Sequence, residues 1–180
     1  MISKNIEIEL KVLVSKQQFY SLLMYFKPDS TVEFIEQTNY YYKAIGMQEK
    51  DVLRIRKRKN NFFFTFKRNT VAGLEEYEKE LPTCAFDEEV IAYLKTFGLF
   101  APYILLGTLT TNRYSITIDN KAELSFDINH YNGITDYEIE YECLKEHDYL
   151  ETFSSILNQA GIPYRHNHCS KYLRYINTKK

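Results

Sequence analysis

The stretch Asn5-Ile-Glu-Ile-Glu-Leu-Lys-Val-Leu-Val14, near the N-terminus, decides how the rest of the chain is interpreted. Polar and apolar residues alternate strictly along it, which predicts a β-strand because successive strand side chains point to opposite faces. Glu7, Glu9 and Lys11 then share one face, and aliphatic residues occupy the other.

Two carboxylates side by side on a strand repel each other, and a solvent-facing strand gains nothing from that arrangement. A divalent cation between Glu7 and Glu9 would turn the repulsion into attraction, and Lys11 beside them could meet an anion. An ordinary half-exposed strand is the alternative interpretation, and this stretch alone does not separate the two.

The composition predicts a single globular domain over residues 1–180, with 44% hydrophobic and 16% aromatic residues. The cysteines Cys84, Cys143 and Cys169 lack a CxxC spacing, which favours reduced thiols in a cytoplasmic protein. We find no apolar run of membrane-spanning length and no apolar core of a signal peptide at the N-terminus, so no membrane partner is expected.

The charges are segregated along the chain, although the net charge of −1 argues against bulk attraction to nucleic acid. Residues 51–68 carry seven basic residues against Asp51, and residues 136–151 carry seven acidic residues against Lys145. Segregated charges of both signs suit a site that holds metal and phosphate together.

Helices are expected between groups of strands. A capping box at Ser15 opens a helix that runs to Phe26, Asp87 caps a second helix to Phe97, and a third covers 147–160. The last segment, 170–176, is compatible with a helix or a strand. The further strands are expected at 34–44, 51–59, 62–68, 75–81, 104–110, 113–119, 122–129 and 136–144, with a tight turn at Asn60-Asn61.

Eight or nine strands of this kind favour an α+β fold with an antiparallel sheet closed into a barrel, and we predict a closed antiparallel eight-stranded β-barrel with helices packed on the outside. Charged residues align on one face of three strands. If those faces point outward, the protein is a plain barrel with a salt-bridged exterior; if inward, it encloses a polar tunnel. The amphipathic helices favour the tunnel, because they need apolar surface to cover. The aligned sets are Arg54, Arg56 and Arg58; Glu76, Glu78 and Glu80; and Glu138, Glu140 and Glu142.

Short motifs follow one another in a fixed order from Glu7 to Lys171. They are Glu7-x-Glu9-x-Lys11, Gln37–Tyr42, Leu53–Arg56, Phe64–Arg68, Glu78–Glu80, Thr111–Arg113, Leu124–Asp127, Tyr137–Glu140 and Ser170-Lys171. In this order the chain resembles the CYTH superfamily, also called triphosphate tunnel metalloenzymes. The resemblance implies a tunnel that binds a triphosphate together with Mg²⁺ or Mn²⁺.

The resemblance also implies a set of metal ligands, which are Glu7, Glu9, Asp127, Glu138 and Glu140. Glu142 continues the face of Glu138 and Glu140, so the late pair of ligands is either Glu138/Glu140 or Glu140/Glu142. Glu78 and Glu80 would support a second metal, orient water, or form salt bridges. His166 and His168 are expected to be a surface or packing pair, since two histidines do not complete a zinc site.

The phosphate side would be formed by six cations, Lys11, Arg54, Arg56, Lys67, Arg113 and Lys171. Because Lys171 is far from the others in sequence, we expect the C-terminal segment to close over one side of the barrel and bring it to the substrate. Arg58 is expected to be a solvated strand end near a tunnel mouth. Lys57, Lys59 and Arg68 are expected to be surface charges.

The implied activity is hydrolysis of a triphosphate, most simply inorganic tripolyphosphate, with Glu7, Glu9, Lys11 and Arg56 as catalytic residues and water as nucleophile. The alternatives are adenylate cyclase or thiamine triphosphatase activity, or a non-catalytic polyphosphate-binding module. An RNA-binding barrel using Arg58, Lys59 and the aromatics of Phe62–Phe66 is less favoured because of the net negative charge. No nucleic-acid partner is expected, and the protein would be a monomer or homodimer.

Overall fold

The computed structural model describes residues 1–27, 31–71, 73–165, 167 and 169–179. In these ranges nine strands form one antiparallel sheet in the order β1-β6-β5-β4-β3-β7-β8-β9-β2. The strands are β1 (Ser3–Glu7), β2 (Glu9–Val14), β3 (Glu33–Ile45), β4 (Val52–Arg58), β5 (Asn61–Thr70), β6 (Gly73–Leu81), β7 (Phe100–Ile118), β8 (Ala122–Tyr131) and β9 (Ile134–Cys143). The helices are α1 (Lys16–Phe26), α2 (Glu88–Thr96), α3 (Tyr149–Asn158) and α4 (Lys171–Asn177).

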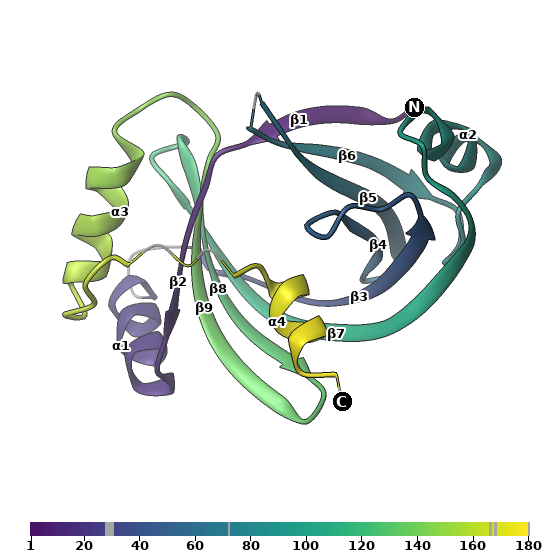
Figure 1. Ribbon diagram of the computed structural model, residues 1–180. Coiled ribbons are helices and arrows are strands. Elements are labelled where there is room, and N and C mark those ends of the chain that lie inside the picture. The colour runs from purple at the N-terminus through teal and green to yellow at the C-terminus, as the bar shows by residue number, and fades with distance from the viewer. Residues whose placement is uncertain (28–30, 72, 166, 168, 180) are drawn as a thin grey trace.

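The sheet curls on itself but stays open (Figure 1). Its two edges are β1, paired with β6, and β2, paired with β9. Only Ile8 separates β1 from β2, so the chain itself crosses from one edge to the other. The prediction of a closed eight-stranded barrel was therefore wrong, because the edges are joined by the covalent chain and not by a ladder of hydrogen bonds.

The prediction of a single N-terminal strand was also wrong, because the segment is divided at Ile8 into β1 and β2. The carbonyl of Ile8 accepts a hydrogen bond from the amide of Cys143 at 2.9 Å. The strands predicted at 104–110 and 113–119 form one strand, β7. The polar residues at its middle do not turn the chain, because Thr111 is buried and its hydroxyl donates to Asn129 Oδ1 at 2.7 Å.

The hairpin between β4 and β5 turns one residue earlier than predicted. Arg58 pairs with Asn61, so Lys59 and Asn60 form the turn, and Lys59 adopts the positive φ of 55° that such turns require. The open choice for residues 170–176 is resolved as a helix, because Ser170 caps α4 by accepting from the amide of Leu173.

The apolar faces of the strands lie on the convex side, under the helices, as the tunnel interpretation predicts. Helices α1 and α3 bury Phe19 and Phe153 against a cluster that includes Phe126 of β8. Helix α2 buries Leu94 against Phe64 of β5 in a second cluster. The charged faces therefore point to the concave side. Among the described residues, we find no helix with the length and hydropathy needed to cross a membrane.

Helix α4 packs on the concave side of the sheet, at one end (Figure 1). Tyr175 is buried against Tyr41 and Leu109, and its hydroxyl donates to the carbonyl of Leu106 at 2.9 Å. Gly107 makes this approach possible, because a Cβ there would lie 2.1 Å from the Tyr175 hydroxyl. As expected, the C-terminal segment returns to the sheet and covers one end of its concave face.

Candidate functional site

Three arginines of β4, Arg54, Arg56 and Arg58, form a cationic wall on the concave face. Arg56 Nε donates to Asn39 Oδ1 at 2.9 Å, and an Arg54 Nη lies 3.6 Å from a Glu76 oxygen. The Nε atoms of Arg54 and Arg58 are buried without a hydrogen-bond partner among the described residues. Buried donors that the protein itself does not pair are normally completed by water, an ion or a ligand.

The wall also carries mutually repelling charges. Burial, together with the guanidinium groups of Arg54 and Arg113, lowers the pKa of Arg56 to about 9. Arg56 is still a cation at neutral pH, and an anion beside it would relieve the repulsion. The prediction of Arg58 as a solvated strand end was wrong, because it is half-buried and lines the cavity described below.

Lys57, between Arg56 and Arg58 of the wall, points to the opposite face of β4, as the two-residue period of a strand requires. Lys57 and Lys59 are exposed, as predicted. Arg68, also predicted to be a surface charge, instead lies 2.6 Å from the buried Asp51 and donates to the carbonyl of Phe97. It ties β5 to the end of α2 and is not part of the wall.

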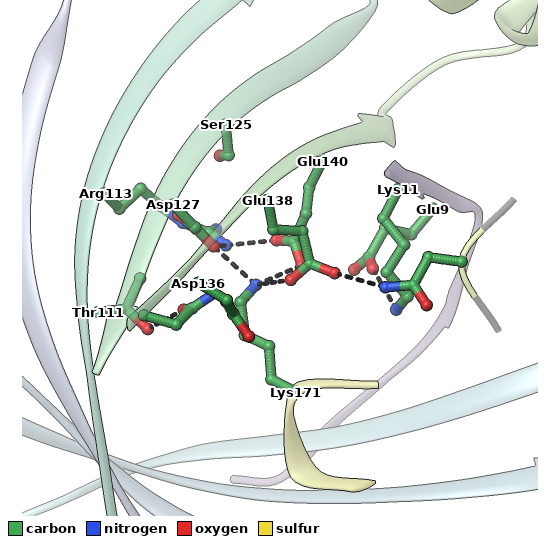
Figure 2. Close-up of polar contacts among 12 residues, drawn as sticks. Glu9, Lys11, Thr111, Arg113, Ser125, Asp127, Asp136, Glu138, Glu140 and Lys171 are labelled. Carbon is green, nitrogen blue, oxygen red and sulfur yellow. Dashed lines mark hydrogen bonds and ion pairs between the residues drawn. The ribbon is translucent and has the colours of Figure 1, made fainter. Parts of the chain in front are cut away.

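A second group, the ion-pair network, lies on β7, β8, β9 and α4 (Figure 2). Its carboxylates are Asp127, Glu138 and Glu140, and its cations are Arg113, Lys171 and Arg174. Arg113 binds Asp127 through two hydrogen bonds of 2.8 and 2.7 Å and also reaches Glu140. The Lys171 ammonium lies 2.7 Å from Asp127 and 3.1 Å from Glu138, and it also contacts Glu140.

The charges of this network hold one another in the ionised form. Burial alone would lower the pKa of Lys171, but Asp127, Glu138 and Glu140 raise it. Burial would likewise raise the pKa of Glu140, but Lys171 and Arg113 hold it well below its usual range. Predicted metal ligands and predicted phosphate ligands thus contact each other directly here.

The sequence interpretation missed Arg174, whose guanidinium pairs with Glu138 through contacts of 3.0 and 2.9 Å and with Asp136 at 2.9 Å. Burial alone would lower the pKa of Arg174, but Glu138 and Asp136 outweigh burial and raise it. Its spacing of three residues from Lys171 places both on one helix face, a signal that appears once residues 170–176 are assigned to a helix.

A third group surrounds Lys67 of β5. Its ammonium lies 2.6 Å from Glu7 and 3.0 Å from Glu76, which is directly opposite in the ladder. Burial raises the pKa of Glu7 to about 8; the charge of Lys67 opposes the shift, and Glu76 adds to it. Burial alone would also raise the pKa of Glu76. Contacts with Lys67, Glu7 and Arg54 outweigh burial and lower this pKa to about 2. The Lys67 ammonium therefore lies between two carboxylates whose pKa values are shifted in opposite directions.

The sequence interpretation aligned Glu76 with Glu78 and Glu80 but did not choose it as a site residue. Glu78 is half-buried and accepts a hydrogen bond from the Thr65 hydroxyl at 3.1 Å, whereas Glu80 is exposed. The charge of Glu78 acts on Arg56, whereas exposed Glu80 forms no ion pair or hydrogen bond with another predicted ligand among the described residues.

Glu9, Lys11 and Glu142 form the last group, on β2 and β9. Lys11 Nζ lies 2.7 Å from Glu9, and in the ladder Glu9 is opposite Glu142 while Lys11 is opposite Glu140. Burial, with the charges of Glu123 and Glu9, raises the pKa of Glu142. Because β1 and β2 lie on different edges, Glu7 and Glu9 join different groups.

The predicted metal ligands offer carboxylate oxygens, which suit a hard divalent cation. Within the described ranges, however, no three His, Cys, Asp or Glu side chains are placed as a metal site. The donor set fits such a cation in its chemistry, while the positions of most of these carboxylates are set by their ion pairs. The prediction for His166 and His168 lies outside the described residues.

A cavity of about 280 Å³ opens on the concave face beside the cationic wall. Its lining mixes charges with apolar groups, among them Arg58, Arg113, Ile35, Phe63 and Glu123. The cavity therefore connects Arg113 of the network with the last arginine of the wall.

The concave face of the curled antiparallel sheet thus carries arginines on one side and paired carboxylates on the other. Residues 5–169 match the CYTH domain. The chain therefore belongs to the CYTH family.

Two relatives cover nearly the whole chain. The chain described here is 28% identical to "Putative triphosphatase YjbK" of Bacillus subtilis (strain 168), over 99% of this chain and 98% of that protein. It is 31% identical to a protein of Bacillus halodurans whose crystal structure is described as that of "a putative adenylate cyclase", with a TM-score of 0.80 over 96% of this chain and 98% of that one. HpAC1 from Hippeastrum, 21% identical with a TM-score of 0.75 over 97% of each chain, shares the fold.

Proposed function

We propose that this protein is a divalent-metal-dependent hydrolase of triphosphate compounds, with inorganic tripolyphosphate as the simplest substrate. The observation that carries the proposal is the cationic wall, in which the buried Nε atoms of Arg54 and Arg58 have no partner among the described residues and the guanidinium charges repel one another. A tripolyphosphate chain offers only charge and acceptor oxygens, which is what these donors need. The relative named as a triphosphatase supports the same class of reaction.

Six cations would bind the substrate, namely Lys11, Arg54, Arg56, Lys67, Arg113 and Lys171. Arg54 and Arg56 would grip phosphate oxygens bidentately, as planar guanidinium groups do. Arg56 would stabilise the charge that develops on the transferred phosphoryl group, and a water molecule would attack the terminal phosphorus in line. Asp127, bound to Arg113 by two hydrogen bonds, would hold that guanidinium in its orientation.

Glu7, Glu9 and Glu140 would hold Mg²⁺ or Mn²⁺. A divalent cation bound there would neutralise phosphate charge and polarise the phosphate oxygens. Glu9 is the predicted ligand least restrained by ion pairs, because in the described part of the chain it pairs with Lys11 alone and both side chains are partly exposed. Lys67 would keep Glu7 within reach of the substrate, since it contacts both of its carboxylate oxygens.

Cyclisation of ATP is a second candidate, favoured by the relative described as an adenylate cyclase and by the cavity lined with Ile35 and Phe63, which could take a base. The test is a phosphate-release panel with tripolyphosphate, thiamine triphosphate, ATP and GTP, each with Mg²⁺ and with Mn²⁺. Phosphate release from tripolyphosphate is the expected result. Cyclic AMP as the mass-identified product of ATP, with no phosphate release, would reject hydrolysis.

A further inference from the structure

The geometry points to Glu138 as the anchor of helix α4, held by Arg174, and not as a ligand of the metal. The part that concerns metal ligands rests on the proposed function; the anchoring does not. If Glu138 is the anchor, the late pair of metal ligands is Glu140 and Glu142, which answers the register question that the sequence leaves open.

The hydrogen bonds of Glu138 leave it no capacity for a metal. A carboxylate accepts about four hydrogen bonds, two at each oxygen. Oε1 of Glu138 accepts from Arg174 at 3.0 Å and from Asn167 Nδ2 at 3.2 Å. Oε2 accepts from Arg174 at 2.9 Å and lies 3.1 Å from Lys171 Nζ. The side chain is fully buried, so a metal would have to displace these partners from the interior.

The hydrogen-bonding capacity of Arg174 is also fully used. A guanidinium has five N–H donors in a fixed fork. They meet Glu138 through two contacts, Asp136 at 2.9 and 3.4 Å, and the carbonyl of Cys169 at 2.9 Å. Arg174 is buried, with 9% of its surface exposed, so Glu138 and Arg174 form a closed ion pair between β9 and α4. Such a pair fixes geometry more than it adds stability.

The consequence for the site passes through Lys171. Lys171 is the first residue of α4 and lies three residues before Arg174, so the anchor sets how far its ammonium reaches into the concave face. Arg174 is therefore a positioning residue for Lys171. Glu142 has a different environment, because its ladder neighbours are Glu9 and Glu123 and no ion pair joins it to a cation in the part of the chain that the structure describes.

The test measures Mn²⁺ affinity by calorimetry without substrate, and amide exchange of residues 171–177, in Glu138→Gln, Arg174→Met and Glu142→Gln. Glu138→Gln and Arg174→Met should each speed exchange of α4 by about tenfold and change the Mn²⁺ dissociation constant by less than about threefold. Glu142→Gln should weaken Mn²⁺ binding by about tenfold or more and leave α4 exchange unchanged. Mn²⁺ binding weakened tenfold in Glu138→Gln, with α4 still protected, would overturn the proposal.

Two further arms keep the result decisive. If Glu138→Gln fails to fold because it leaves Arg174 unpaired, the double variant Glu138→Gln/Arg174→Met removes both charges, and its Mn²⁺ affinity should still match the wild type. The KM for tripolyphosphate should rise by the same factor in Arg174→Met, Lys171→Met and their double variant, with little change in kcat; additive effects would contradict positioning through Lys171. If the wild-type protein binds no Mn²⁺ and cleaves no triphosphate, the proposed function fails, and the exchange data alone decide the anchor.

Discussion

The two charged regions of the concave face differ in how completely their charges are paired. In the ion-pair network, Asp127, Glu138 and Glu140 each contact at least two cations, and all three are buried. In the cationic wall, the carboxylate contact is one 3.6 Å approach from Arg54 to Glu76, and two guanidinium Nε atoms are left without partners in the described chain.

This difference separates scaffold from binding surface. A buried charge with complete partners is costly to break but has little affinity left for a ligand. A buried charge without partners destabilises the free protein and is stabilised by a ligand of opposite sign. We therefore assign the anion-binding role first to the wall, and the role of fixing β8, β9 and α4 first to the network.

Removal of the divalent cation should have the largest effect. With excess EDTA we expect phosphate release from tripolyphosphate to stop, because no divalent cation would then neutralise the phosphate charge and polarise the phosphate oxygens. Activity should return on adding Mg²⁺ or Mn²⁺ beyond the chelator, as measured by colorimetric phosphate assay. Full activity in EDTA would mean that the cationic wall suffices alone and would remove the carboxylates from the mechanism.

Arg56→Met should have the next largest effect. We expect kcat/KM for tripolyphosphate to fall by about 10²- to 10³-fold, since an arginine aimed at the transferred phosphoryl group contributes that much. Lys57→Met is the matched control, because it is the adjacent residue of the same strand and points to the exposed face. Its kcat/KM should stay within about twofold of the wild type. Equal losses in the two variants would contradict the assignment of the wall to substrate.

The two regions should respond oppositely in stability. Asp127→Asn leaves Arg113 and Lys171 buried beside a neutral group, which should cost about 3 kcal/mol and lower Tm by about 10 °C. Arg56→Met removes a repelled cation and should leave Tm unchanged or higher. Glu123→Gln, on the same face of β8 and 39% exposed, is the control and should change stability by less than about 0.5 kcal/mol. Thermal unfolding in EDTA measures all three variants.

A smaller effect concerns pH. Because the pKa of Glu7 is raised to about 8, the folded protein binds this proton more tightly than the unfolded chain does. The stability from this group is thus complete below the unfolded pKa near 4.5 and is lost as pH rises through 8. Glu7→Gln should flatten the decline in unfolding free energy between pH 5 and 8, measured by urea unfolding in EDTA. Parallel pH profiles for the variant and the wild type would contradict the shift.

The sequence predicted the residues of the concave face better than it predicted the two edge strands of the sheet, β1 and β2. Period-two alternation identified which face of β4 and β9 is charged, and the amphipathic helices indicated that this face points inward. The same alternation continues through Ile8, so no local pattern could reveal that β1 and β2 leave for opposite edges. That division depends on pairing with β6 and β9, which are distant in sequence.

The ion-pair partners of the charged residues also could not be predicted from the sequence. The sequence did not indicate that Lys171 also contacts carboxylates, because α4 docks through Tyr175 and thereby sets where the ammonium lies. Glu76 and Arg174 were missed for a related reason: each matters through a partner that only the sheet register and the docked helix bring near.

Whether the cationic wall binds the polyanion is measured by the affinity for tripolyphosphate in EDTA, where calorimetry follows binding without turnover. We expect the double variant Arg54→Met/Arg56→Met to bind tripolyphosphate at least about 100-fold more weakly than the wild type, since each lost charge-assisted contact costs about 1.5–3 kcal/mol. The Tm of the free variant should be no lower than that of the wild type. Wild-type affinity in this variant would contradict the account and place the anion site elsewhere on the concave face.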